Sequence, residues 1–320
     1  MSCLFSNCYA ITALSVDDLD VSNVKTLDST FLSCSTLKSL NLNKWNTHNV
    51  TTLRCTFAGC SSITDLNISD IDTSNVTSMD STFSSCKAIN TVDVSKWNVA
   101  NVKSFSHTFS ACHELTSVDV SKWNTESVTS FDGMFSDCPK LQTIDVHNFD
   151  TSNATTIADM FGLCRSLADI NVSKWNTANV TDISDVFSHC EKLQSVDVSN
   201  WNVSNVTDMS NAFLWCAKLT EVDMSKWNPA KVTDVKCMFE KCSNITALDL
   251  SNFNLTNINI SSMLDDMNGL HMLKAPTLGT LDTLYLPTVM SWLENNTYHE
   301  DMESSTLTGY NINSMMGGAG

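Results

Sequence analysis

The sequence predicts an α/β solenoid, an elongated fold in which short repeats stack on one another. Ten cysteines stand 26 residues apart, from Cys8 to Cys242, and a phenylalanine precedes each by three residues, from Phe5 to Phe239. A side chain recurs at a constant interval when each repeat buries its apolar face only against its neighbours. The 320 residues therefore predict about ten turns of 26 residues in one body.

Each repeat combines two apolar patterns. In a representative repeat, the apolar residues from Val206 to Cys216 are three or four positions apart, which predicts a short helical or 3₁₀ segment. Val222 and Met224 then alternate with a polar residue, which predicts a short strand. Successive strands should pair in one parallel sheet along one side of the solenoid. In most repeats a tryptophan or phenylalanine follows the strand, and we expect it to pack inside.

Two stretches of the repeat carry a family resemblance. LTEVDMSKWN at residues 219–228 fits the leucine-rich repeat pattern L-x-x-L-x-L-x-x-N, with one residue inserted before the Asn. The longer pattern V-x-x-[MIF]-x-x-x-F-x-x-C-x-x-L-x-x-V-D-V-S-x-W-N recurs along the chain. In these motifs the chain resembles the BspA-like leucine-rich repeats of mycoplasma and other bacterial surface lipoproteins. The resemblance implies a sheet on the concave side, display at the cell surface or secretion, and adhesion.

The chain divides into a repeat region and a tail. Residues 1–275 form the predicted solenoid, with an incomplete first unit and a degenerate last unit. Residues 276–320 contain Pro276, Pro287 and Trp292, and we expect this segment to cap the solenoid and to end flexibly. Because the chain opens in mid-repeat without a visible signal peptide, we expect a segment upstream.

Composition argues against several functional classes. The formal net charge is −17 with only 18 Lys and Arg, which disfavours a nucleic-acid groove or a polybasic membrane contact. No apolar run approaches the roughly 20 residues that cross a bilayer, so we expect no membrane insertion. No nucleophile elbow, HExxH, paired CxxC or glycine-rich phosphate loop appears. We therefore predict a protein that is not an enzyme and has no cofactor.

The cysteines are predicted to be reduced. Neighbouring cysteines of the ladder would lie about 5 Å apart at Cα, within the reach of a disulfide. Each has two equivalent neighbours, however, and the total of 13 is odd. We interpret the ladder as a buried column of small apolar side chains.

One candidate binding surface is a file of aspartates between the two apolar residues of the strands. It consists of Asp93, Asp119, Asp145, Asp197, Asp223 and Asp249. Lysines three residues later and adjacent serines could compensate the file internally. Alternatively, the file is a polar recognition strip for a cationic partner, a glycan or weakly held Ca²⁺, since Ca²⁺ prefers carboxylate oxygens.

A second candidate surface lies in two variable columns just before the ladder cysteines. Leu214 and Trp215 are large and apolar in columns that are otherwise mostly small or polar, and Leu163 lies two turns earlier. An exposed Trp beside a Leu is a plausible anchor for a partner. The alternative is that both side chains fold down onto adjoining turns or onto the C-terminal tail.

The preferred function is a recognition scaffold that binds a protein or glycan on another cell or matrix. A second hypothesis is a structural spacer or assembly subunit, in which copies associate end to end. A third is an intracellular interaction scaffold, which the absent signal peptide and the reduced cysteines would suit. A solenoid fixes geometry and leaves the ligand unspecified, so sequence alone leaves these alternatives open.

Overall fold

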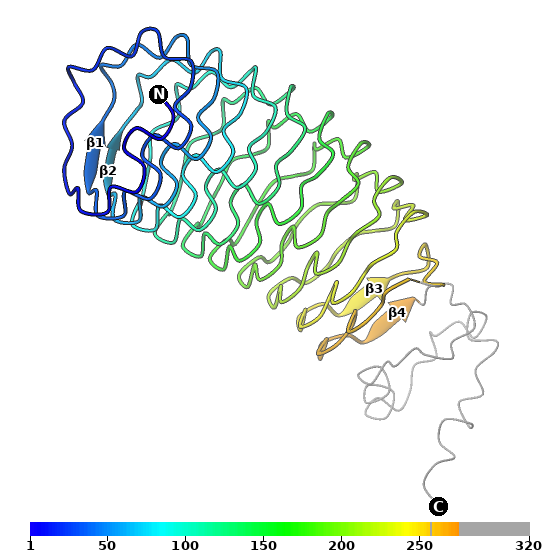
Figure 1. The fold of residues 1–320 in the computed structure, drawn as a ribbon. Coiled ribbons are helices and arrows are strands. Elements are labelled where there is room, and N and C mark those ends of the chain that lie inside the picture. The colour runs from blue at the N-terminus through cyan, green and yellow to red at the C-terminus, as the bar shows by residue number, and fades with distance from the viewer. Residues whose placement is uncertain (257, 275–320) are drawn as a thin grey trace, which may run out of the picture.

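The computed structural model describes residues 1–256 and 258–274, which form an elongated stack of turns (Figure 1). The N-terminus lies at one end of the stack and residue 274 at the other. The predicted leucine-rich repeat solenoid is confirmed. The predicted cap at 276–320 lies outside the described residues.

Regular strands occur at the two ends of the described solenoid. Strand β1 (Ser39–Asn41) pairs in parallel with β2 (Asp65–Asn67), and β3 (Ala247–Asp249) pairs in parallel with β4 (Met272–Lys274). In each pair the residues one repeat apart are in register, such as Leu40 with Leu66. We call the side of the solenoid that carries these strands the strand side. In the described turns between the two strand pairs, neighbouring repeats are joined there by isolated backbone hydrogen bonds. The predicted parallel sheet is therefore present as paired strands only near the two ends of the described solenoid.

The segment predicted to be helical is a series of turns, and that part of the prediction is wrong. In residues 79–86, the N–H groups of Ser81 and Phe83 donate to carbonyls of the next turn, both at 2.8 Å. The intervening Thr82 N–H instead bonds back three residues, to the Met79 carbonyl at 3.1 Å. A helix needs every N–H for its own ladder. Here every second N–H group donates to the next repeat, so a helix cannot form.

Left-handed backbone at two positions per repeat makes this alternation possible. Ser81 and Ser85 have φ of 55° and 61°, and the equivalent residues of the other turns share this conformation. We call this segment of each repeat the turn side. A file of parallel bridges of one residue per turn runs beside it from Thr26 to Asn259. The turn side thus provides an uninterrupted hydrogen-bonded spine.

Columns of phenylalanine, cysteine, tryptophan and aliphatic side chains fill the interior. Phe83 and Phe109 stack with ring centroids 5.1 Å apart, and the other phenylalanines of the column continue the stack. The ladder cysteines from Cys34 to Cys242 are buried, and all thirteen cysteines are free. Burial raises the pKa of the Cys86 thiol to about 12, so it stays protonated at neutral pH. The predicted burial of the cysteine ladder is confirmed for these turns, and its reduced state stays a prediction.

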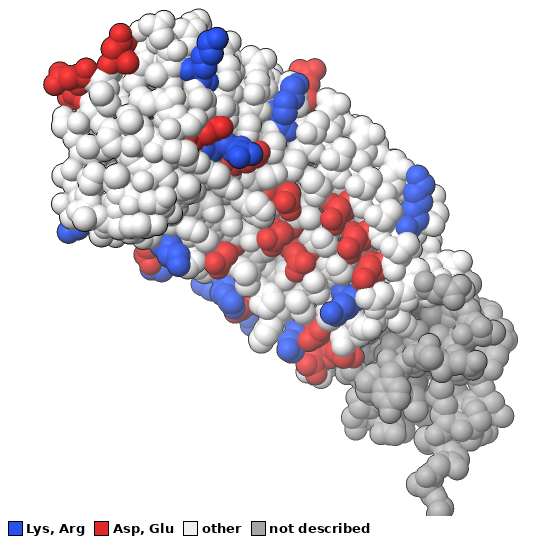
Figure 2. Space-filling model, in the orientation of Figure 1, with Lys and Arg blue, Asp and Glu red and all other residues white. Residues whose placement is uncertain are grey.

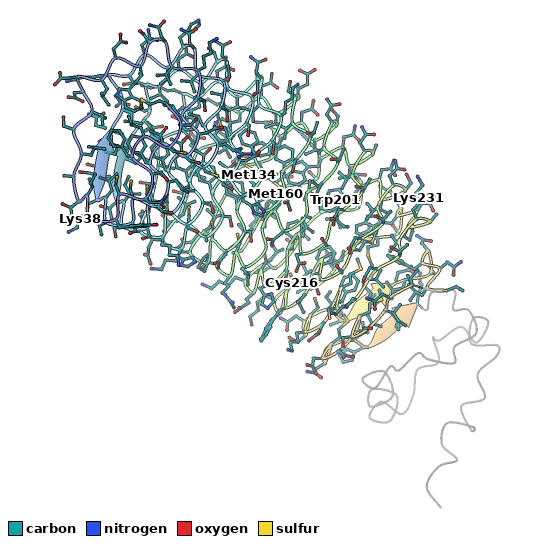
Figure 3. The ribbon with its side chains drawn as sticks, in the orientation of Figure 1. Lys38, Met134, Met160, Trp201, Cys216 and Lys231 are labelled. Carbon is teal, nitrogen blue, oxygen red and sulfur yellow. The ribbon has the colours of Figure 1, made fainter. Side chains whose placement is uncertain are left out.

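The tryptophan column is tied to the backbone as well as packed. Trp201, labelled in Figure 3 together with Cys216, is 2% exposed, and its Nε1–H points to the Val172 carbonyl at 3.4 Å. The indole of Trp97 makes the equivalent bond to the Ile68 carbonyl at 3.1 Å. Each buried indole N–H therefore has an acceptor in the preceding turn, which satisfies a group that is costly to bury alone.

Candidate functional site

The aspartate file lies on the strand side with its carboxylates toward solvent. Five of its members are exposed and Asp249 is half-buried. Asp119 is typical: its Oδ1 accepts hydrogen bonds from the Ser121 hydroxyl at 2.7 Å and from the Ser121 N–H at 3.1 Å. These two bonds hold the pKa of Asp119 below its usual range. Each carboxylate of the file has one oxygen that accepts a hydrogen bond from the residue two positions later.

The lysines do not compensate the file as expected. Lys96 Nζ bonds the Asp70 carboxylate at 2.8 Å, which lies one turn back in the lysine's own column. Among the described residues, Asp249 is the member of the file with a lysine partner, because Lys274 Nζ lies 2.9 Å from it. A lysine stem reaches the preceding turn more directly than it folds back over its own. The file therefore keeps most of its negative charge.

The described residues hold no group of three or more His, Cys, Asp or Glu side chains placed to hold a metal ion. The file spaces its carboxylates one turn apart, with a serine beside most of them. Weak Ca²⁺ binding therefore stays a prediction for a binding assay.

The second candidate surface contains a partly covered tryptophan. Trp215 is 41% exposed, and its ring lies between the imidazole of His189 and the ammonium of Lys241. The ring centroids of His189 and Trp215 are 5.3 Å apart, and Lys241 Nζ lies 4.4 Å from the Trp215 ring. A cation over an indole face is a favourable contact. The arrangement leaves part of the indole accessible on a fixed side chain.

Leu163, His189, Trp215 and Lys241 are equivalent residues of four consecutive turns, and we call them the Trp215 column. All four have positive φ, between 57° and 63°. Leu163 is half-buried, and so is Leu214, which directly precedes Trp215 in the sequence. This column lies on the turn side, whereas the aspartate file lies on the strand side, so the structure does not bring the two predicted surfaces together.

Sequence reasoning missed an acidic cluster on the turn side. The carboxylates of Asp132 and Asp185 lie near Asp159, and that of Asp182 lies near Asp132; His107 is close to both Asp132 and Asp159. Burial, more than the neighbouring carboxylates, raises the pKa of Asp159 to about 6. Figure 2 shows Asp and Glu gathered on the middle of one face. For Asp182 the sequence carried a signal, because the bridge file changes there from hydroxyl to carboxyl residues, whereas Asp132, Asp159 and Asp185 lie in other columns.

Sequence reasoning also missed a cavity of about 400 Å³ at a corner after the strand side. Its lining is His147, Asn148, Phe149, Asp150, Thr151, Ser152, Lys174 and Asn176. A smaller cavity of about 240 Å³ lies at β1 and β2, where Asn41, Asp65 and Asn67 contribute to its lining. The signal for the larger cavity is the sequence His-Asn-Phe where neighbouring repeats have Ser-Lys-Trp.

Fold and surface together define a leucine-rich repeat solenoid with a uniform interior and locally varied surfaces. The chain belongs to the family described as Mycoplasma protein of unknown function, DUF285, whose model matches residues 1–117, 79–173 and 164–272. The curated proteins compared with the chain include no match. No helix among the described residues is long and apolar enough to span a membrane.

Solved structures similar to this chain include leucine-rich repeat proteins from several bacteria. A leucine-rich repeat protein from Bacteroides ovatus is 18% identical, with a TM-score of 0.43, over 87% of this chain and 76% of that one. A leucine-rich cell surface protein from Faecalibacterium prausnitzii is 16% identical, with a TM-score of 0.36, over 81% and 78%. An internalin from Listeria monocytogenes is 15% identical, with a TM-score of 0.30, over 86% and 84%.

Proposed function

We propose that this protein is a recognition scaffold at the cell surface or in the secreted fraction, and that it binds a protein or glycan partner. The observation that carries the proposal is Trp215, a large aromatic residue that is 41% exposed at a backbone position with φ of 58°. Ordinary side chains adopt this conformation at a cost, and Trp is a frequent anchor in interfaces. An exposed indole at this position is available to anchor a partner.

The division between interior and surface supports the same proposal. The interior columns repeat from turn to turn, so they define the shape of the scaffold. The surface columns differ from turn to turn, and they provide distinct chemistry at distinct places on a rigid body. Such a body presents side chains without the entropic cost of ordering them on binding. Nothing in this arrangement requires catalysis, and the proposal is for a protein that is not an enzyme.

A binding screen tests the proposal. The whole chain is screened against extracellular-matrix proteins and a glycan array, with and without Ca²⁺. Trp215→Ala is compared with Ser85→Ala, which shortens a side chain at the equivalent left-handed position five turns earlier. The double variant Asp119→Asn/Asp145→Asn tests the aspartate file.

We expect saturable binding that Trp215→Ala weakens by about tenfold or more and that Ser85→Ala leaves unchanged. Loss in the aspartate variant alone would move the binding face to the strand side, and loss on Ca²⁺ removal would assign the ion a role. Absence of binding to every protein and glycan would overturn the proposal. Concentration-dependent association in analytical ultracentrifugation of that same sample would then favour the spacer hypothesis.

A further inference from the structure

The cavity at the 147–152 corner arises from three consecutive departures from the repeat. The turn before it has Ser121, Lys122 and Trp123, and the turn after it has Ser-Lys-Trp at 173–175. In the turn between them these positions are His147, Asn148 and Phe149. Phe149 is smaller than Trp and Asn148 is shorter than Lys, so the corner is less completely filled. The cavity therefore lies at the turn in which all three positions depart from the Ser-Lys-Trp pattern.

The wall and the size of this cavity suit a small ligand. Its volume of about 400 Å³ falls within the roughly 300–1,000 Å³ of small-molecule sites. Phe149 lines it and is held in place, because it is 4% exposed and its ring centroid lies 5.5 Å from that of Phe131. The cavity therefore has one fixed apolar wall.

The cation that lines the cavity lacks the kind of partner that Lys96 and Lys226 have in the same column. Lys96 and Lys226 each bond a residue one turn back in their own column, Asp70 at 2.8 Å and Asn200 at 3.2 Å. The residue one turn back from Lys174 is Asn148, and no hydrogen bond or ion pair joins them. Within the described part of the chain, the Lys174 ammonium lines the cavity without a protein partner.

A carboxylate oxygen in the cavity is similarly available. Asp150 Oδ1 accepts the Ser152 N–H at 2.9 Å. Three turns earlier in this column, Asp72 uses its second oxygen to bond His48 in the preceding turn at 3.0 Å. For Asp150 the equivalent residue in the preceding turn is Glu126, which repels it. Among the described residues, the second oxygen of Asp150 has no cationic partner.

A third polar group of the lining is buried without a partner. His147 Nδ1 has no hydrogen-bond partner among the described residues and is shielded from solvent. Leaving such a group unpaired costs about 1–3 kcal/mol. The amides of Asn148 and Asn176 line the same cavity. Because the His147 Nδ1 atom is shielded, a ligand in the cavity does not reach it, and the groups that the cavity offers are an ammonium, a carboxylate oxygen and two amides around an apolar wall.

We propose that this cavity binds one hexose unit of a glycan, an assignment that rests on the proposed recognition function and names its ligand class. Sugar hydroxyls both donate and accept, so they can satisfy Asp150 and Lys174 at once. The C–H face of the ring suits the wall formed by Phe149. A phosphate or another anion would meet the negative charges of Asp150 and Glu126.

Titration with single sugars tests the assignment. Glucose, galactose, N-acetylglucosamine and glucuronic acid are each titrated into the whole chain and followed by saturation-transfer difference NMR. Lys174→Ala is compared with Lys122→Ala, the equivalent lysine two turns earlier, which does not line the cavity. The triple variant His147→Ser/Asn148→Lys/Phe149→Trp restores the repeat and fills the cavity. Thermal unfolding followed by circular dichroism verifies that each variant is folded.

We expect at least one sugar to bind saturably, with affinity about tenfold lower in Lys174→Ala and lost in the triple variant. Lys122→Ala should bind like the original chain, and the triple variant should melt at the same or a higher temperature. The assignment is overturned if none of the four sugars binds, or if binding survives in the folded triple variant. If the chain still binds a matrix protein or an intact glycan in that case, the proposed function stands and this inference alone fails.

Discussion

The turn side and the strand side of the solenoid hold successive repeats together in different ways. On the turn side, four N–H groups of each repeat donate to the next one, as Phe105, His107, Phe109 and Ala111 do at 2.8–3.0 Å. On the strand side of the middle turns the repeats are joined by isolated bonds, such as Thr116 N–H to the Asn90 carbonyl at 3.0 Å. The backbone therefore fixes the stacking mainly from the turn side, and the strand side depends more on side-chain packing.

The largest expected effect comes from the aromatic stack beside the turn side. Phe109→Ala removes a ring that lies 5.1 Å from Phe83 and 5.4 Å from Phe135, and it should lower the free energy of unfolding by about 3–5 kcal/mol. Val118→Ala, on the strand side, should lower it by about 1–2 kcal/mol. Urea denaturation followed by circular dichroism measures both. Equal losses would remove the distinction between the two sides.

Hydrogen exchange tests the same comparison at the backbone. The N–H groups of Phe109 and Ala111 have acceptors in the next turn, whereas no hydrogen bond is formed by the Val118 N–H among the described residues. We expect the turn-side amides to exchange at least about tenfold more slowly, which corresponds to ~1.4 kcal/mol. Mass spectrometry of overlapping peptides measures the rates. Equal protection would indicate a regular sheet through the middle turns.

Two aspartates on the two sides should respond to pH with opposite sign, and the turn-side residue has the larger effect. Burial raises the pKa of Asp159 to about 6, above the roughly 3.9 of an unfolded chain. Between these values the unfolded chain releases a proton that the folded chain keeps, so stability falls as pH rises. Asp159→Asn should therefore stabilise by about 1 kcal/mol at pH above 7, with solvent screening allowed for, and should be nearly neutral near pH 4.

The strand-side counterpart is Asp119, where the expected change is smallest. Hydrogen bonds from Ser121 lower its pKa, so its contribution is present at neutral pH and is lost as pH falls through the folded-state pKa. Asp119→Asn should destabilise by about 0.5 kcal/mol or less at neutral pH, since the group is exposed. Thermal melts of both variants at neutral and acid pH measure the difference. If both substitutions raised, or both lowered, the melting temperature at neutral pH, the opposite pKa shifts of the two aspartates would be contradicted.

The interior was predictable because its columns are chemically uniform. Phe109 and Cys112 recur at a fixed spacing, and only stacked burial explains such a recurrence. The helical prediction was wrong for a specific reason. Three-residue turns separated by left-handed residues place apolar side chains three and four apart, as a helix does. The left-handed positions include His107, Leu163 and Trp215 as well as glycine, so no residue type marks them.

The candidate sites were only partly predictable. Trp215 differs from the residues of its own column, so its exposure could be anticipated from the sequence. The pairing of Lys96 with the preceding turn depends on how far a lysine stem reaches, which no spacing reveals. The cavity at Phe149 depends on two smaller side chains at adjacent positions. Comparing repeats position by position would have found it, whereas a search for catalytic motifs does not.

Four N–H groups per turn on the turn side donate toward the C-terminal end and one in the bridge file, such as Thr129 to the Lys103 carbonyl at 2.8 Å, donates the opposite way, so the solenoid has a net electrical polarity along its axis. Each of the four N–H groups points toward the C-terminal end, and each carbonyl that accepts one points toward the N-terminal end. Aligned peptide dipoles add, as they do in an α-helix, where the N-terminal end is the positive one. In this solenoid the sense is reversed, and the field of the spine runs from repeat to repeat with its positive pole in the direction of chain growth.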